Sequence, residues 1–165
     1  MNSAVDPLSY DLDGVRDRAL RERGGAVDDS IPELADADPD LLGIALITLD
    51  GETRATAQAD VQISIQSAVK PFLFALALQD HGPAALDRLG IEPTGEAFDA
   101  IKLESGTGRP PNPMVNAGAL LTSALVDGAD AAARSRRILA GLSAFAGRDL
   151  SVSESVAESE HLLGD

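Results

Sequence analysis

The chain contains no cysteine, which excludes a disulfide framework, thiolate chemistry and any metal site built on thiolates. Its two histidines, His81 and His161, lie far apart and lack the spacing of metal ligands. His81 precedes Gly82 at an expected helix end, where an imidazole beside the last carbonyl groups is common. We therefore expect both histidines to be structural, and we expect the protein to use no metal ion and no other cofactor.

Positive charge is scarce. Only 13 lysine and arginine residues stand against 27 aspartate and glutamate residues, for a formal net charge of −14. Nucleic acids and anionic membranes are bound through cationic surfaces, so the composition argues against both as partners. A small neutral or zwitterionic substrate is the simpler expectation, and most of the acidity is interpreted as a solvated surface.

Long apolar runs are also absent, and the longest one is far shorter than a membrane span. Residues 1–10 lack the basic segment and apolar core that are typical of a signal peptide, so we expect a cytoplasmic protein. The 165 residues, 44% of them hydrophobic, suffice for one domain with a core and show no sign of two complete domains.

The most informative motif is the tetrad Ser-Ala-Val-Lys at residues 67–70, just ahead of an apolar segment. On a helix, positions i and i+3 share a face, with Cβ atoms roughly 5–6 Å apart, so the amine of Lys70 can reach the hydroxyl of Ser67. Burial disfavours the ammonium form of a lysine and can lower its pKa by several units, which lets the amine accept a proton. The tetrad therefore predicts a serine nucleophile with a lysine as its base.

The segment after the tetrad supports this interpretation. Residues 71–78 read Pro-Phe-Leu-Phe-Ala-Leu-Ala-Leu, and a helix that is apolar nearly all round is a buried one. Pro71 is consistent with a helix start just upstream, which would place Ser67 at the positive end of the helix dipole. The alternative is a capping serine and a surface lysine. Against that alternative, Lys70 and Lys102 are the only lysines beside eleven arginines.

The apolar run 41–49, the dipeptide Asp50-Gly51 and the alternating residues 52–57 predict a β-hairpin with a central first strand and a more exposed second strand. Such a small sheet lacks strands to complete it, which suggests that the chain stops early. The other expected elements are a surface helix ending at Gly24-Gly25, a loop with at most one helical turn over 28–40, a strand or extended segment over 61–65, and helices over 83–89, around 96–101, from 116 or 117, over 131–145 and over 152–161.

Three segments, in order and spacing, resemble the serine-dependent glutaminases: Ile-Gln-Ser-Ala-Val-Lys-Pro-Phe at 65–72, Ile-Glu-Pro-Thr-Gly-Glu-Ala-Phe at 91–98, and Asn-Pro-Met-Val-Asn-Ala-Gly-Ala at 112–119. The resemblance covers residues 25–165, so we expect an N-terminal helical extension, residues 1–24, and the N-terminal portion of a glutaminase domain, residues 25–165. It implies an α/β fold of the α+β type, the serine β-lactamase-like fold, with the hairpin and most of the helical part present and the C-terminal strands missing. It also implies hydrolysis of L-glutamine to L-glutamate and ammonia, and a homo-oligomer, dimer or tetramer, for the full-length protein.

The resemblance further implies roles for five residues. Ser67 is similar to the family's acyl-accepting nucleophile, and Lys70 is similar to the base that returns the proton to the departing ammonia. Asn116 and Glu160 resemble ligands of the substrate, the carboxylate of Glu160 meeting the α-ammonium group. Ser67 and Gln66 are expected to bind the substrate as well, Gln66 as a positioning residue and not a chemical one. Two alternatives stay open here: Asn116 as the cap of a helix that begins at the next residue, and Glu160 as one more acid on a solvated helix.

Two departures from the family pattern affect the prediction. Ser30 stands where the family has a tyrosine, and the chain ends at Asp165, about half the family's usual length. The family's later asparagine, two active-site tyrosines and second oxyanion-hole amide would lie beyond that point. Each missing oxyanion donor costs about 10²–10³ in rate, so we expect this chain alone to be a weak enzyme or inactive.

Two other functions compete with the glutaminase reading. The first is a β-lactamase-like or penicillin-binding-like serine hydrolase, which also uses Ser-x-x-Lys, although its Ser-x-Asn and Lys-Thr-Gly signatures are absent from this chain. The second is a non-catalytic fragment or pseudoenzyme, which the serine at position 30 and the short chain both favour.

Overall fold

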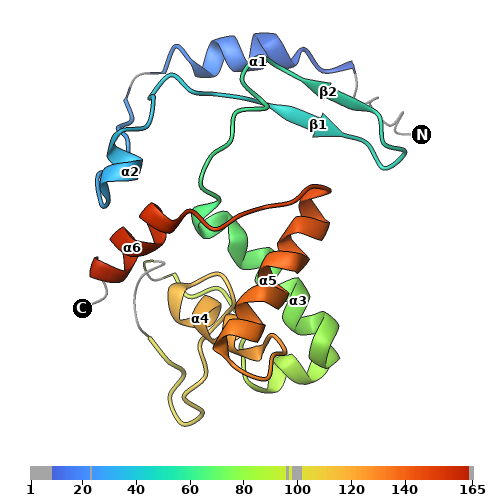
Figure 1. Cartoon of the computed structure of the whole chain (residues 1–165), viewed down its shortest axis with the longest axis vertical. Helices are drawn as coiled ribbons and strands as arrows, with labels where there is room; N and C mark the ends of the chain where they lie inside the picture. The colour runs from blue at the N-terminus through green and yellow to red at the C-terminus, as the bar shows by residue number, and fades with distance from the viewer. Residues whose placement is uncertain (1–8, 23, 96, 98–101, 164–165) are drawn as a thin grey trace. The chain divides into compact units, whose positions relative to one another are not determined.

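The computed structural model describes residues 9–22, 24–95, 97 and 102–163 (Figure 1). The chain divides into two compact units: unit 1 is residues 1–64 with residues 153–165, and unit 2 is residues 65–152. The helices and strands, in chain order, are α1 (Leu12–Ala19), α2 (Pro32–Ala35), β1 (Ala45–Ile47), β2 (Thr53–Ala55), α3 (Lys70–His81), α4 (Asn116–Leu125), α5 (Ala131–Ala146) and α6 (Glu154–Leu163). Short 3₁₀ helices cover Gln66–Val69 and Gly82–Asp87.

In unit 1, α1 begins with a side-chain cap. The carboxylate of Asp11 accepts a hydrogen bond from the N–H of Gly14 at 2.9 Å, which satisfies one of the free donors of the first turn. A Cβ atom at Gly14 would lie 2.1 Å from the Asp11 Oδ2, so a larger residue there would require the capping carboxylate to move. The predicted surface helix is confirmed, but it ends at Ala19 and not at Gly24-Gly25.

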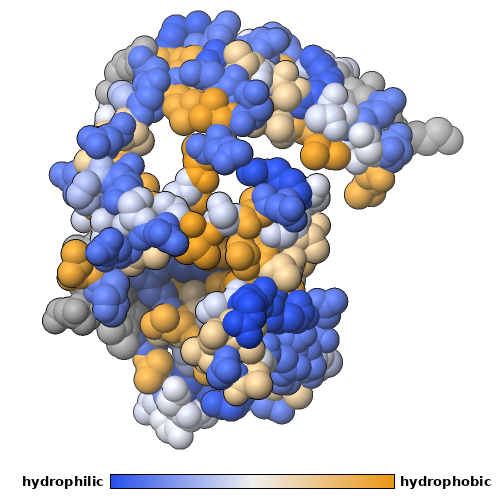
Figure 2. All heavy atoms as spheres, viewed as in Figure 1, coloured by the Kyte–Doolittle hydropathy of each residue, from blue (hydrophilic) through white to orange (hydrophobic). Residues whose placement is uncertain are grey.

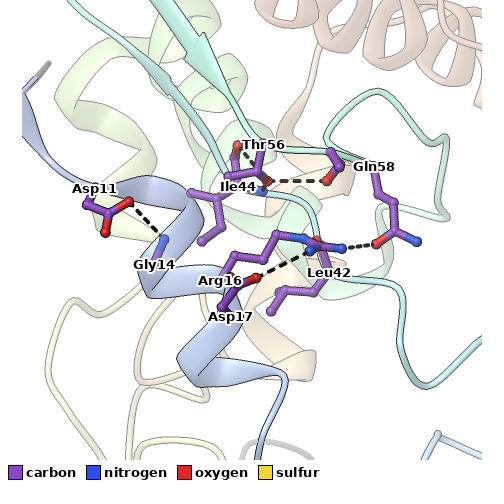
Figure 3. A network of polar contacts seen from close by, with 9 residues as sticks. Asp11, Gly14, Arg16, Asp17, Leu42, Ile44, Thr56 and Gln58 are labelled. Atoms are coloured by element: carbon purple, nitrogen blue, oxygen red, sulfur yellow. Dashed lines mark hydrogen bonds and ion pairs between the residues drawn. The ribbon is translucent and has the colours of Figure 1, made fainter.

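Arg16 of α1 joins segments on both sides of the hairpin (Figure 3). Its Nε donates to the carbonyl oxygen of Leu42 at 2.6 Å, and its Nη2 donates to the Oε1 of Gln58 at 2.5 Å. Close by, the hydroxyl of Thr56 accepts a hydrogen bond from the N–H of Ile44 at 3.0 Å. One planar guanidinium group thus connects three segments that are distant in the sequence.

β1 and β2 form the predicted hairpin. The strands are antiparallel, with Ala45 opposite Ala55 and Ile47 opposite Thr53. Gly51 in the turn has a φ of +89°, a region that glycine adopts without steric cost.

The prediction of a central first strand is wrong. Ile47 is 71% exposed and Leu49 is fully exposed. Within the described residues β1 pairs only with β2, which leaves its other edge without a strand. Residues 61–65 form no strand, and Ile65, with φ −68° and ψ −26°, is not extended, so the strand or extended segment predicted here is not formed as such. A two-stranded sheet cannot cover its own apolar face, which explains why a run that reads as buried lies open.

The remaining helices of unit 1, α2 and α6, contact each other. The hydroxyl of Ser159 donates to the Oε1 of Glu33 at 3.2 Å. α2 is a single turn, as predicted for this loop, and α6 confirms the predicted last helix. In the described part of unit 1, the buried hydrophobic side chains are Leu12 and Ile31, so the core of this unit is small.

Unit 2 packs its helices around α3. The side chains of Leu73, Leu76 and Ala77 are buried, as the apolar sequence predicted, whereas Phe72 is 37% exposed. α4 and α5 both contact α3. A Cβ atom at Gly141 of α5 would come within 2.6 Å of the Leu76 Cδ2, so glycine lets the two helices approach closely.

A polar cluster ties the ends of these helices together. Asp80, at 8% side-chain exposure, accepts hydrogen bonds from the N–H of Asp127 at 3.0 Å and from the Nη2 of Arg137 at 2.7 Å. Burial raises the pKa of Asp80, but these hydrogen bonds and the charge of Arg137 outweigh it and hold the pKa below its usual 3.8. The Nε2 of His81 lies 2.5 Å from the carbonyl oxygen of Leu125, in keeping with the structural role predicted for this histidine.

The later helices follow the sequence closely, with one difference. The helix expected over 83–89 is a 3₁₀ helix, Gly82–Asp87, whereas α4 and α5 are confirmed as α-helices. The helical stretch expected around 96–101 lies outside the described residues, apart from Ala97. Over the described ranges, no helix has both the length and the apolar character needed to cross a membrane.

Large apolar side chains are exposed in both units, and Figure 2 shows them in orange among the blue hydrophilic residues. In unit 2, the rings of Phe72 and Phe145 lie 5.3 Å apart and both are exposed. In unit 1, Leu49 and Ile63 are among the most exposed. Both units therefore present apolar side chains to solvent.

Candidate functional site

The Ser-Ala-Val-Lys tetrad lies where the 3₁₀ turn Gln66–Val69 runs into α3, which begins at Lys70. The N–H of Lys70 donates to the carbonyl oxygen of Ser67 and closes the turn. In a 3₁₀ turn the side chains at i and i+3 eclipse each other, so Ser67 and Lys70 leave the backbone on the same side. Ser67 is exposed, whereas Lys70 is only 8% exposed, so an exposed serine and a buried lysine share one turn.

Asn116 meets Lys70. The Nζ of Lys70 donates a hydrogen bond to the Oδ1 of Asn116 at 2.7 Å, and this contact joins the first residue of α3 to the first residue of α4. The alternative role of Asn116 as a cap is wrong, because α4 starts at Asn116 and its N-cap position is Val115. The amide oxygen is used for the lysine instead.

Gln66 has an unusual backbone conformation. Its φ of +44° makes it one of two non-glycine residues with positive φ in the described part of the chain. A residue with a Cβ atom pays about 1–2 kcal/mol in this region, and such strain gathers at functional sites. Gln66 immediately precedes Ser67, so the strained peptide lies at the predicted nucleophile. The positioning role of Gln66 stays a prediction.

Glu160 belongs to unit 1, whereas the other four predicted site residues belong to unit 2. It lies on α6 and is exposed. The preceding residue, Ser159, is held by Glu33 of α2, whose Oε2 is buried without a hydrogen-bond partner among the described residues. The neighbouring contact thus fixes the helix that carries Glu160, and its role at the site stays a prediction.

One polar residue near the site was not given a role from the sequence. Asn112 accepts two backbone hydrogen bonds directly ahead of α4 and donates a third to another segment. An asparagine whose side chain bonds to the backbone N–H two residues on is a common turn signal, so its position before Pro113 could have suggested this function.

The arrangement in unit 2 has the parts of acyl-transfer chemistry. An exposed hydroxyl can attack a carbonyl carbon, an amine one turn away can carry its proton, and an amide orients that amine. Over the described residues, no group of three histidine, aspartate or glutamate side chains is placed to hold a metal ion.

Comparison with known sequences points in one direction. The family model described as Glutaminase matches residues 25–165. A glutaminase of Clavibacter michiganensis subsp. michiganensis is 66% identical over 165 residues, covering 99% of this chain and 51% of that protein. A glutaminase of Nostoc sp. (strain PCC 7120) is 45% identical over 148 residues, covering 89% of this chain and 44% of that protein. The chain therefore spans about half the length of the curated relatives that it matches.

Solved structures agree. Mglu in its native form superimposes with a TM-score of 0.84 at 43% identity, covering 92% of this chain and 37% of that chain. The probable glutaminase YbaS gives a TM-score of 0.84 at 34% identity, covering 92% of this chain and 51% of that chain. These structures have the β-lactamase-like fold, so the predicted fold class is confirmed, and this chain contains part of that fold.

Proposed function

The chain belongs to the glutaminase family, and from this premise we propose that it supplies the N-terminal portion of an enzyme that hydrolyses L-glutamine to L-glutamate and ammonia. Residues 25–165 would form that portion and residues 1–24 an extension. The observation that carries the proposal is the 2.7 Å hydrogen bond from the buried Lys70 to Asn116, one turn from the exposed Ser67.

The first half of the proposed reaction transfers an acyl group to the protein. The Oγ of Ser67 attacks the side-chain amide carbon of glutamine while the Nζ of Lys70 takes the hydroxyl proton. The C–N bond then breaks, the proton passes from Lys70 to the leaving nitrogen, and ammonia departs. The product is a glutamyl ester on Ser67.

The second half releases glutamate. A water molecule attacks the ester carbon, and Lys70 takes one of its protons. The bond to the Oγ of Ser67 breaks, and the proton returns to that oxygen. Glutamate leaves, and both side chains regain their starting states.

Recognition of the substrate is assigned to two further residues. We assign the amino-acid end of glutamine to Asn116, because an amide can accept from Lys70 and donate to a carboxylate at the same time. The carboxylate of Glu160 would meet the α-ammonium group. Gln66 would hold Ser67 in place through its strained backbone.

Ammonia release from glutamine tests the proposal. It is measured on this chain and on this chain extended with the C-terminal half of the Clavibacter relative. In the extended protein, Ser67→Ala should abolish release, and Lys70→Ala should lower it by about 10²–10⁴-fold. Two matched controls, Ser151→Ala and Lys102→Ala, should stay within about twofold of the parent, since substitutions at exposed surface positions usually have small effects. An extended protein that neither releases ammonia nor binds glutamine would show that the assignment is wrong.

A trapping experiment checks the covalent step. Hydroxylamine added with glutamine should divert the ester on Ser67 into γ-glutamyl hydroxamate, and Ser67→Ala should form none. Mass spectrometry after incubation with benzylpenicillin examines the competing function. A stable adduct on Ser67, without turnover of glutamine, would assign the site to the β-lactam-reactive hydrolases instead.

Two wider expectations remain proposals. The extended protein is expected to be a cytoplasmic homo-oligomer, a dimer or tetramer. Light scattering on the extended protein measures its mass directly, and a monomer at all concentrations would contradict this expectation. The exposed rings of Phe72 and Phe145 are the first apolar surface to inspect if an oligomer is found.

A further inference from the structure

Asn112 bonds to three backbone groups in two segments beside the start of α4. Its Oδ1 accepts hydrogen bonds from the N–H of Met114 at 2.9 Å and from the N–H of Val115 at 3.2 Å. Its Nδ2 donates to the carbonyl oxygen of Glu92 at 2.9 Å. One side chain therefore uses its acceptor on the entry to α4 and its donor on a segment twenty residues earlier.

At two positions that contact the main chain near Asn112, the packing is so close that only glycine fits. A Cβ atom at Gly118 of α4 would lie 1.8 Å from the carbonyl oxygen of Asn112. A Cβ atom at Gly90 would lie 2.4 Å from the carbonyl oxygen of Pro111. The N–H of Gly90 also donates to the carbonyl oxygen of Pro110 at 2.9 Å. The backbone of residues 110–112 is thus in direct contact with Gly90 and with Gly118.

We propose that Asn112 is a positioning residue of the site: it fixes the first turn of α4 so that the Oδ1 of Asn116 meets the Nζ of Lys70. Val115, the N-cap of α4, has no polar side chain and cannot satisfy the free N–H groups of that helix start. Asn112 accepts instead from the N–H groups of Met114 and Val115, the two residues just before α4, and so fixes the backbone that leads into Asn116.

The geometry leaves little tolerance. Asn116 is exposed, so the position of its side chain depends on the path of the backbone and on Lys70. A shift of α4 by about 1 Å would lengthen a 2.7 Å contact beyond hydrogen-bond range. The inference rests on the proposed function only for its catalytic consequence, because the placement of Lys70 can be measured without turnover.

The chain has only two lysines, Lys70 and Lys102, so acetylation by acetic anhydride reports on each of them by peptide mass spectrometry. Lys102 is exposed and serves as the internal reference. In Asn112→Ala, the initial labelling ratio of Lys70 to Lys102 should rise by about fivefold, as the loss of three hydrogen bonds that hold the entry to α4 predicts. Asn112→Asp keeps the acceptor for the α4 entry but loses the donor to Glu92, so its ratio should rise by only about twofold.

Asp130→Ala is the matched control. Asp130 caps α5 in the same unit by accepting from the N–H of Ala133 at 2.7 Å, so its loss weakens a helix start without touching the site. The labelling ratio of Lys70 to Lys102 in this variant should equal that of the chain without a substitution. An unchanged ratio in both Asn112 variants, or an equal rise in Asp130→Ala, would overturn the proposal. If the Asn112→Ala chain fails to fold, the Asn112→Asp comparison decides alone.

The same variants in the extended protein separate this inference from the proposed function. Ammonia release by Asn112→Ala should fall by about fivefold and be partly restored in Asn112→Asp. An extended protein that never turns over glutamine, but whose Lys70 labelling still rises in Asn112→Ala, would refute the proposed function and keep the positioning role.

Discussion

The two units differ in how they are held together. Unit 1 contains 18 acidic and 5 basic residues, a net charge of −13, whereas unit 2 contains 9 acidic and 8 basic residues, a net charge of −1. Among the residues that the structure describes, two buried hydrophobic side chains belong to unit 1 and seven belong to unit 2. Unit 2 therefore depends on packing of helices, and unit 1 depends on polar contacts and a small hairpin.

This difference explains where the chemical groups lie. A lysine side chain is shielded from water only where other side chains pack around it. Lys70 lies at the start of α3, the described helix with the most buried side chains. Nothing comparable surrounds Glu160, which is exposed on an acidic unit. Ser67 and Lys70, the proposed proton-transfer pair, thus belong to the packed unit, whereas Glu160 belongs to the solvated one.

The largest expected effect contrasts one leucine of the core with one isoleucine of the sheet. Leu76→Ala should lower the free energy of unfolding by about 2–5 kcal/mol, because it leaves a cavity against α5. Ile47→Ala, on the exposed β1, should change it by less than about 0.5 kcal/mol. Hydrogen exchange of the amides in each unit, measured at increasing urea concentrations, gives the change in the free energy of unfolding for both variants. Equal losses would remove the distinction between the units.

The next effect concerns the polar cluster of unit 2 and its pH dependence. The pKa of Asp80 in the folded protein lies below 3.8, so its stabilisation is present above that pH and is lost as the pH falls through the folded pKa. Asp80→Asn should therefore cost about 1–3 kcal/mol at neutral pH and little in strong acid. Unfolding curves across this range test it, with the exposed Asp87→Asn as control. A gap between Asp80→Asn and the parent that stays constant down to strong acid would contradict the prediction.

A smaller effect is expected for the polar contacts that hold unit 1. Arg16→Ala removes two hydrogen bonds, to Leu42 and Gln58, and should cost about 1–2 kcal/mol, seen as faster hydrogen exchange in α1 and the hairpin (Figure 3). Arg18→Ala removes the same charge from an exposed position and should have little effect. If both variants behave alike, charge and not the hydrogen bonds holds α1.

The smallest effect is a response to salt. Raising NaCl from about 10 mM to about 0.5 M shortens the range of charge repulsion from about 30 Å to a few ångströms. Protection of the β1 and β2 amides should rise by up to about 1 kcal/mol, because unit 1 carries nearly all the net charge. α3 should barely respond. A uniform response in both units would mean that the charge difference does not affect their stability.

Local patterns predicted much of this molecule. The Ser67–Lys70 spacing needs only one helical turn, and Asp50-Gly51 needs only a tight turn between two strands, so both features were readable from neighbouring residues. The burial of β1 was not, because it depends on whether other strands cover it. The predicted end of α1 was also wrong, because the helix stops before Gly24 and Gly25. Arg16, which bonds to distant segments, lies in the part of the chain that is helical.

The sequence by itself determined which groups could react: a serine and a lysine one turn apart, ahead of a helix apolar enough to be buried. Only the tertiary structure decided which distant side chain contacts the lysine. Asn116 lies 46 residues from Lys70 in the chain, and no local pattern can state that its oxygen accepts from that amine at 2.7 Å. That contact depends on the packing of α4 against α3 and on the side chain of Asn112, because an ångström of backbone position decides whether a hydrogen bond forms.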